Sequence, residues 1–195
     1  MRSLLRSSRP AAGERSEAPA GRELLNSERI EQRFGSYGIE VLESGAAYRV
    51  SNLYSLEGAQ KICRTFAVVR YPETVAPEFA LEHQRILAGG SIGAVFSAAG
   101  WRVEKRHLYF GTLTATRRVA ELMGIVAGTA LATHVYVLDV VKDDHRFQYA
   151  AIVEIHHPDY LRAADLPAIY GPADPAGRTE LVTTMLTVAK AKMSD

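Results

Sequence analysis

Two long runs of β-forming residues, at 130–140 and 147–155, are separated by only six residues, most of them charged. Because a parallel pair needs a crossover of about a dozen residues or more, these runs are expected to form an antiparallel hairpin. A second hairpin is predicted upstream, with strands at 48–54 and 62–69 around a Glu-Gly turn. Strands and helices do not alternate regularly along the chain. The predicted fold is therefore α+β, with an antiparallel sheet and helices packed on one face.

The remaining elements are predicted from apolar periodicity and from turn residues. Further strands are expected at 39–43 and 101–113, and helices at 21–34, 77–88, 91–99, 116–123 and 179–192. After Pro158 the chain is expected to be loop-like until the C-terminal helix. Residues 1–21 are rich in Arg, Ser, Ala, Gly and Pro, so a disordered N-terminal tail is predicted there. Residues 22–195 are expected to form a single domain.

The charge of the chain is nearly balanced, with 23 basic and 22 acidic residues and a formal net charge of +1. This balance argues against a nucleic-acid-binding domain that depends on a large positive field. The single cysteine, Cys63, excludes an intramolecular disulfide and a cysteine-rich zinc site. No apolar run reaches the roughly 18 residues that a membrane span needs, and the N-terminal residues lack the apolar core of a signal peptide. A cytoplasmic monomer or homodimer with no membrane partner is expected.

Glu154 is the one carboxylate in the apolar stretch 151–155. An ionised carboxylate in a buried strand is costly unless it is paired or used. Two interpretations stay open: a solvent-facing glutamate on an edge strand, or a pocket carboxylate that acts as acid, base or hydroxyl acceptor. Arg49 and Arg64 flank the upstream hairpin, and a guanidinium fork matches a carboxylate bidentately. Although arginines in strands often face water, the three residues together indicate a pocket for a small carboxylated ligand.

His156 and His157 are adjacent in the sequence, as are Cys63 and Arg64. Neighbouring strand residues point to opposite faces of a sheet, and no third ligand lies at a useful spacing from the two histidines. No metal site and no cofactor are therefore predicted. A cationic neighbour lowers the pKa of a thiol, but no Cys–His dyad is evident, and Cys63 is expected to be a small core residue. The sequence contains no Gly-x-Ser-x-Gly, Walker-type or His-Glu-x-x-His motif.

Four stretches, in this order, resemble segments of the chorismate lyase family: Arg33-Phe34 with the strand after it, the hairpin from Arg49 to Arg64-Thr65, residues 87–96, and residues 153–158. In the family a ligand-binding arginine opens the hairpin, and an Arg-Thr pair closes it some fifteen positions later, as it does here. The stretch Val-Glu-Ile-His-His-Pro resembles the family's Thr-Glu-Leu-Phe-Leu-Pro. Residues 87–96 resemble a Leu-Gly-x-x-Pro-Leu-Gly segment, with Ser91 in the place of the usual proline. The resemblance covers residues 25–161, of which 101–128 are more similar to the UTRA ligand-binding domains of bacterial transcription regulators.

The resemblance implies a chorismate lyase-like fold and the elimination of pyruvate from chorismate to give a hydroxybenzoate, with no cofactor. It implies that Arg49 grips the ring carboxylate and that Glu154 meets the ring hydroxyl, as the catalytic pair. The substrate-binding residues that it implies are Arg64, Ile92, Gly93 and Ile30. Two alternatives stay open: a non-catalytic, UTRA-like sensor of an aromatic carboxylate, and a related enzyme that acts on another carboxylated substrate.

Overall fold

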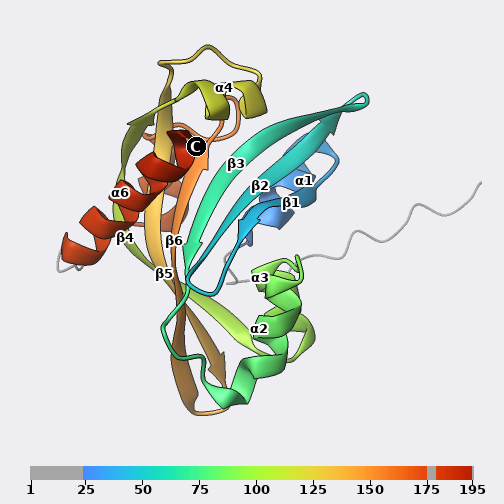
Figure 1. Ribbon diagram of the computed structural model, residues 1–195, viewed down its shortest axis with the longest axis vertical. Coiled ribbons are helices and arrows are strands. Elements are labelled where there is room, and N and C mark those ends of the chain that lie inside the picture. Colours follow the sequence, from blue (N-terminus) through green and yellow to red (C-terminus); the bar gives the residue numbers. More distant parts are fainter. Residues whose placement is uncertain (1–23, 175–178, 195) are drawn as a thin grey trace, which may run out of the picture.

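The computed structural model describes residues 24–174 and 179–194, and the predicted tail at 1–21 lies outside them (Figure 1). The strands in this part of the chain are β1 (Gly38–Ser44), β2 (Tyr48–Glu57), β3 (Gln60–Arg70), β4 (Arg102–Thr114), β5 (Ala130–Lys142) and β6 (His145–His156). The helices are α1 (Asn26–Phe34), α2 (Ala80–Leu87), α3 (Ile92–Ala98), α4 (Arg117–Met123), α5 (Asp165–Tyr170) and α6 (Thr179–Ser194), and a 3-10 turn at Pro77–Phe79 precedes α2. Among these helices, none combines the length and the apolar character that a membrane crossing needs.

The strands form one antiparallel sheet in the order β1-β2-β3-β6-β5-β4. Both predicted hairpins are present, as β2–β3 and β5–β6, which confirms the α+β fold with an antiparallel sheet. The β5–β6 connection is shorter than predicted, because the strands continue into the charged stretch and leave only Asp143 and Asp144 as the turn. Asp143 has a φ of 52°, a left-handed conformation that aspartate tolerates and that tight hairpin turns require.

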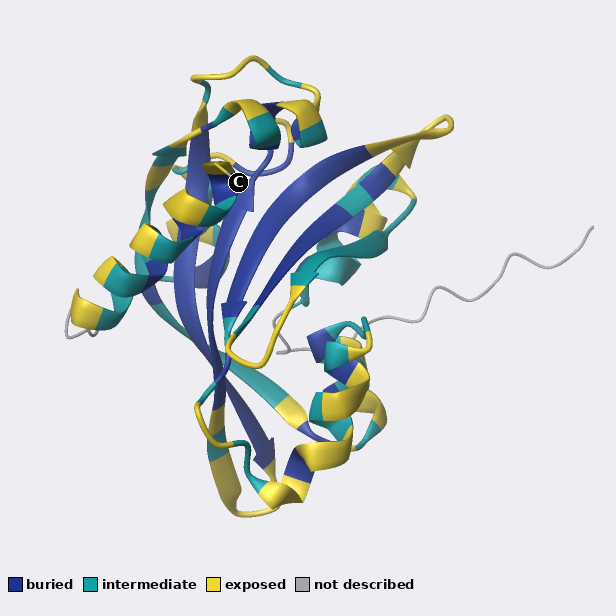
Figure 2. Cartoon of the chain, viewed as in Figure 1, coloured by how far each residue is buried: buried dark blue, intermediate teal, exposed yellow. Residues whose placement is uncertain are grey.

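Residues of β6 alternate between two buried faces of the sheet. Val153 and Ile155 belong to the core that α4 and α6 cover, whereas Ile152 and Glu154 lie on the face covered by α1, α2 and α3. The helices therefore cover both faces of the sheet, not the single face predicted from the sequence (Figure 1). The long buried runs of β5 and β6 are the cause, because a strand that is apolar on both sides needs cover on both. Figure 2 shows the central strands as buried along most of their length.

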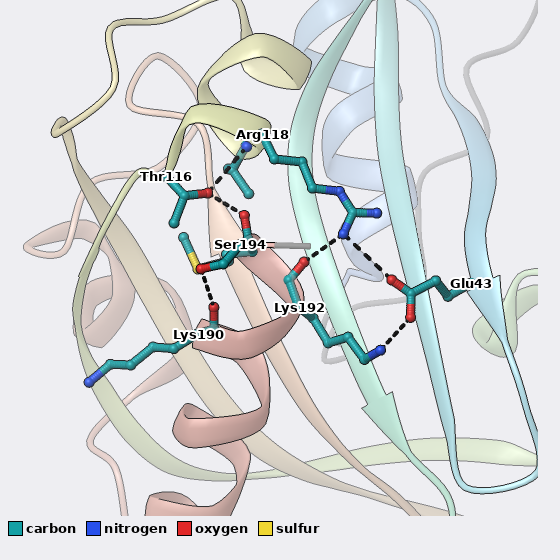
Figure 3. A network of polar contacts seen from close by, with 8 residues as sticks. Glu43, Thr116, Arg118, Lys190, Lys192 and Ser194 are labelled. Atoms are coloured by element: carbon teal, nitrogen blue, oxygen red, sulfur yellow. Dashed lines mark hydrogen bonds and ion pairs between the residues drawn. The ribbon is translucent and has the colours of Figure 1, made fainter.

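The last turn of α6 is held by polar contacts to α4 and β1 (Figure 3). Lys192 Nζ lies 2.5 Å from Glu43 Oε2, and Arg118 Nη1 donates to the carbonyl oxygen of Lys192 at 2.9 Å. The Thr116 hydroxyl donates to the carbonyl oxygen of Met193. Because the last carbonyl groups of a helix have no partners within the helix, these contacts cap α6 and attach the C-terminal helix to the sheet.

Helix α5 lies in the segment that was predicted to be a loop. The prolines of that segment suggested irregular structure, but Pro167 falls in the first turn of α5, where the missing N–H costs little. Leu166 and Tyr170 are buried on this helix and share a core with Ile30 of α1. The helix therefore closes the face of the sheet on which Glu154 lies.

Candidate functional site

A cavity of about 70 Å³ lies on the face of the sheet that α1 and α3 cover. Its apolar lining includes Leu25, Ile39, Leu53, Ala67, Val69, Ile92, Leu138 and Ile152. Its polar lining consists of Asn26, Ser27, Tyr37, Arg49, Ser91, Lys105, Tyr136 and Glu154. The volume is well below the roughly 300 Å³ at which pockets for drug-sized ligands begin. A ring-sized ligand therefore requires the covering helices to move.

Arg49 extends from β2 into this region and is almost completely buried, with 3 % of its surface exposed. Its Nη1 donates to the carbonyl oxygens of Ile86 and Gly90, at 2.9 Å each. The guanidinium thereby ties the connection between α2 and α3 to the sheet. Its Nε has no hydrogen-bond acceptor among the described residues. A buried, charged donor without an acceptor is costly, so this edge of Arg49 is suited to an anionic ligand.

Glu154 lies on the central strand β6, is 4 % exposed and lines the cavity, so the interpretation as a solvent-facing glutamate on an edge strand is wrong. The Tyr136 hydroxyl, from the neighbouring strand β5, donates to Glu154 Oε1 at 3.0 Å. The other carboxylate oxygen, Oε2, lies 4.0 Å from His156 Nε2. The carboxylate is thus surrounded by polar groups within the buried sheet face.

Lys105 of β4 is a second cation in the cavity lining. Its ammonium lies 5.4 Å from the centre of the Tyr136 ring and 5.3 Å from that of the Tyr170 ring. Tyr37 adds a phenol to the lining. Burial raises the pKa of this phenol, and a hydrogen bond with Ser91 partly offsets the rise. The phenol is therefore a neutral hydroxyl at pH 7, and the net charge of the lining comes from two cations and one carboxylate.

Ile92 and Gly93, at the start of α3, line the cavity as predicted from the family resemblance. A Cβ atom on Gly93 would lie 2.5 Å from Leu25 Cδ1, closer than real contacts allow. The absence of a side chain lets α3 approach the residue that precedes α1. Leu25 and Gly93 are therefore neighbours in the wall of the cavity.

Arg64 and Ile30 do not line the cavity. The Arg64 guanidinium donates to Ser55 Oγ at 2.7 Å and to Glu57, and it lies 4.0 Å from the centre of the Phe34 ring. Ile30 is fully buried in the α1–α5 core. The structure thus brings Arg49, Glu154, Ile92 and Gly93 together and leaves Arg64 and Ile30 outside the group.

Two histidines lie next to Glu154 on the same sheet face. His134 is its register partner on β5, and His156 is two residues further along β6. One donor atom from each of His134, Glu154 and His156 lies within 4.8 Å of the other two. His157, the neighbour of His156 in the sequence, points away from the cluster and contacts the carbonyl oxygen of Met123 through Nε2 at 3.1 Å. His134 was not predicted as a third donor, because partners across a sheet are not marked by any spacing in the sequence.

Burial controls the charge of these side chains. It lowers the pKa of His156 to about 3, and the positive charges of Lys105 and Arg29 add to the shift. Burial also lowers the pKa of His134 well below its usual value, with contributions from His156, His107 and Lys105. Both imidazoles are therefore neutral at pH 7.

Cys63 is fully buried in the core that α4 and α6 cover, which confirms the prediction of a core residue. Burial raises the pKa of its thiol, although the charge of Arg64 opposes this shift. The thiol is therefore protonated at pH 7 and unsuited to nucleophilic chemistry.

Lys105 and Tyr136 are two further site residues that the sequence did not indicate. Lys105 lies among several charged residues of β4, and Tyr136 lies in an apolar run, so neither stands out by type or spacing. The register explains their role, because β4 pairs with β5 and β5 with β6, which places one face of all three strands under α1 and α3.

No protein-family model matches the chain, and no curated protein matches it. Three solved structures that are similar to it come from bacteria. The C-terminal domain of Yurk from Bacillus subtilis is 15 % identical, with 65 % of this chain and 89 % of that chain covered and a TM-score of 0.37. A GntR-family transcriptional regulator from Enterococcus faecalis is 11 % identical, with 65 % and 93 % covered and a TM-score of 0.41. The ligand-binding domain of a GntR-family regulator from Bordetella bronchiseptica is 11 % identical, with 65 % and 87 % covered and a TM-score of 0.40. Likeness at this level assigns neither a family nor a function to the chain.

Proposed function

We propose that this chain is a small-molecule-binding domain whose ligand is a carboxylate on an aromatic ring. The observation that carries the proposal is the buried Arg49 guanidinium, whose Nε lacks an acceptor among the described residues, at a cavity with an apolar lining. Lys105 adds a second positive charge to the lining. Two cations and one carboxylate favour an anionic ligand over a neutral or cationic one.

The remaining lining suits the other parts of such a ligand. Ile92, Leu138 and Ile152 offer aliphatic surfaces to a flat ring, and Glu154 offers an acceptor to a ring hydroxyl. In a site without water, the contact between a guanidinium and a carboxylate is much stronger than in bulk solvent.

Entry of a ring is coupled to the helices. Arg49 also holds the carbonyl oxygens of Ile86 and Gly90 through Nη1, so the guanidinium that would meet a ligand carboxylate at Nε is attached to the α2–α3 connection. The cavity also has to enlarge. Binding is therefore expected to displace α2 and α3, which is how a sensor domain converts occupancy into a change of shape.

Titration calorimetry with 4-hydroxybenzoate tests this function, with benzoate, 3-hydroxybenzoate and phenol as comparisons. Arg49→Lys keeps the charge but removes the fork, and we expect it to weaken carboxylate binding by about 10-fold or more. Ala67→Leu fills the cavity without changing its charge and is expected to abolish binding. Arg70→Lys, on the same sheet but outside the cavity lining, is the matched control. Failure of every carboxylate to bind the folded protein, or equal binding by Ala67→Leu, contradicts the proposal.

Catalysis is the second candidate, and the Glu154–Tyr136 pair favours it. A buried carboxylate that accepts a hydroxyl hydrogen bond next to two cations is able to move a proton of a bound substrate. The reaction would be the elimination of pyruvate from chorismate, measured as release of pyruvate and hydroxybenzoate against a control without protein. Glu154→Gln is then expected to lower turnover more than binding. Ligand binding without product release would favour the sensor function.

A further inference from the structure

The buried cluster of His134, Glu154 and His156 has the composition of a metal site, and we infer that it binds one zinc-like transition-metal ion. Glu154 also lines the cavity proposed for the organic ligand, but the ion needs no organic ligand to bind. All three residues are buried, with exposed fractions of 0, 4 and 0 %. They belong to two paired central strands, which fixes their backbones relative to one another. Two imidazoles and one carboxylate form a common donor set for nitrogen-preferring divalent ions, with further coordination positions open to water or ligand.

The distances are close to those of a bound ion. Donors on a tetrahedral zinc ion, with bonds of about 2.1 Å, lie about 3.4 Å from one another. His156 Nε2 and Glu154 Oε2 lie 4.0 Å apart, and one donor atom from each of the three residues lies within 4.8 Å of the other two. Small side-chain rotations, with no change in strand pairing, are therefore enough to close the site.

The hydrogen bonds around the cluster orient the ligands. His156 Nδ1 lies 3.1 Å from Thr65 Oγ1, and His134 Nε2 lies 2.8 Å from His107 Nδ1. A metal-bound histidine normally donates its second ring N–H to such a partner. With the rings in that tautomer, lone pairs remain on His156 Nε2 and His134 Nδ1. Both of these nitrogens are buried and have no hydrogen-bond partner in the part of the chain that the structure describes.

The charges around the cluster select the kind of ion. Both imidazoles are neutral at pH 7, which is the form that binds metals. Lys105 and Arg29 oppose any cation, and Glu154 supplies the negative charge within the cluster. Binding therefore depends on nitrogen donors more than on net charge. Zn²⁺ and Co²⁺ fit this requirement, whereas Mg²⁺ and Ca²⁺, which need several oxygen ligands, do not.

The test uses the full chain, stripped with EDTA and free of organic ligand. Zn²⁺ bound after gel filtration is measured by elemental analysis, and Co²⁺ binding is followed by its visible absorption. We expect one ion per chain, and X-ray absorption of the zinc-loaded wild-type protein is expected to show two imidazole ligands and one carboxylate. That measurement needs no variant, so it decides the question even where a substitution prevents folding.

Variants locate the ion. His156→Asn and His134→Asn are expected to weaken binding by about 100-fold or more, and Thr65→Val by about 10-fold through loss of orientation. His145→Asn, at the exposed start of β6, is the matched control and is expected to bind like the wild type. Binding of less than one ion per chain, a spectrum without imidazole ligands, or affinity that survives His156→Asn overturns the inference. Binding of 4-hydroxybenzoate is measured separately on the EDTA-treated protein, so either proposal fails without the other.

Discussion

Acidification of the metal-free protein tests the electrostatics of the buried sheet face most directly. Full burial of His156 beside the positive charges of Lys105 and Arg29 lowers its pKa to about 3, from an ordinary value of 6.5. Between these values the unfolded chain binds more protons than the folded chain, so stability is lost as the pH falls from 6.5 towards 3. The contribution of His156 to the free energy of unfolding is then about 2 kcal/mol lower at pH 5 than at pH 7.5.

Glu154 Oε2 lies only 4.0 Å from His156 Nε2, and its negative charge acts on the pKa of His156 in the direction opposite to burial. An isolated ion pair at that distance would raise the pKa of the imidazole and make the protein more stable in acid. Burial prevails here, since His156 has no exposed surface and two nearby cations offset the carboxylate. The Tyr136 hydroxyl also stabilises Glu154 without any proton on His156.

The assay is urea unfolding at pH 7.5, 6 and 5 in EDTA, followed by circular dichroism. The free energy of unfolding differs between pH 7.5 and pH 5, and we expect this difference to be about 2 kcal/mol smaller in His156→Gln, because glutamine does not titrate. His145→Gln, at the exposed start of β6, is expected to keep that difference. The comparison is between the pH dependences of the free energy of unfolding in the two proteins, so a loss of stability that is equal at every pH does not affect the result. A wild type that gains stability in acid, or a His156→Gln protein with the wild-type dependence on pH, would show that burial does not lower the pKa of His156.

Three further predictions concern the other face of the sheet. Met185→Ala is expected to lower the free energy of unfolding by about 2–5 kcal/mol in urea, because the side chain is fully buried beneath α6. The Lys192 ammonium lowers the pKa of Glu43, but both groups are partly exposed. Glu43→Gln is therefore expected to cost about 1 kcal/mol or less, and a loss that does not shrink in high salt would contradict an ionic origin. The buried Cys63 thiol, with its raised pKa, is expected to react with a disulfide reagent only after unfolding, and rapid reaction of the native protein would be inconsistent with its position.

The sequence predicted the parts of the fold that depend on local order. The β5–β6 hairpin follows from two β-rich runs that are too close together for a crossover. The structure differs from this prediction only in the length of the turn, which is the Asp143-Asp144 pair. The cover on both faces was not predicted, although β5 and β6 carry the signal for it. Near-continuous apolar runs in these strands indicate burial on two sides, whereas a sheet with one wet face alternates.

The site was predicted in part, because its residues depend on register between strands. Arg49 and Glu154 stand out as charges in β-forming segments, and both line the cavity. Arg64 is likewise a charge in a β-forming segment. A register shift between Leu53 and Tyr54 of β2 lies opposite Arg64, however. The Arg64 guanidinium contacts α1 and the β2–β3 hairpin and not the cavity. His134 reaches Glu154 only through the pairing of β5 with β6, which no spacing in the sequence encodes.

The attachment of the α2–α3 connection to Arg49 makes ligand affinity depend on how often that connection opens. A ligand that binds only the open form has its affinity reduced by the fraction of molecules in that form. If about 1 % of molecules are open, the measured Kd is about 100-fold weaker than that of the open form alone. Substitution of Gly90, which is not part of the cavity lining, would then tighten binding by raising the open population. The range of ligand concentrations to which such a domain responds can therefore change through residues outside the cavity lining.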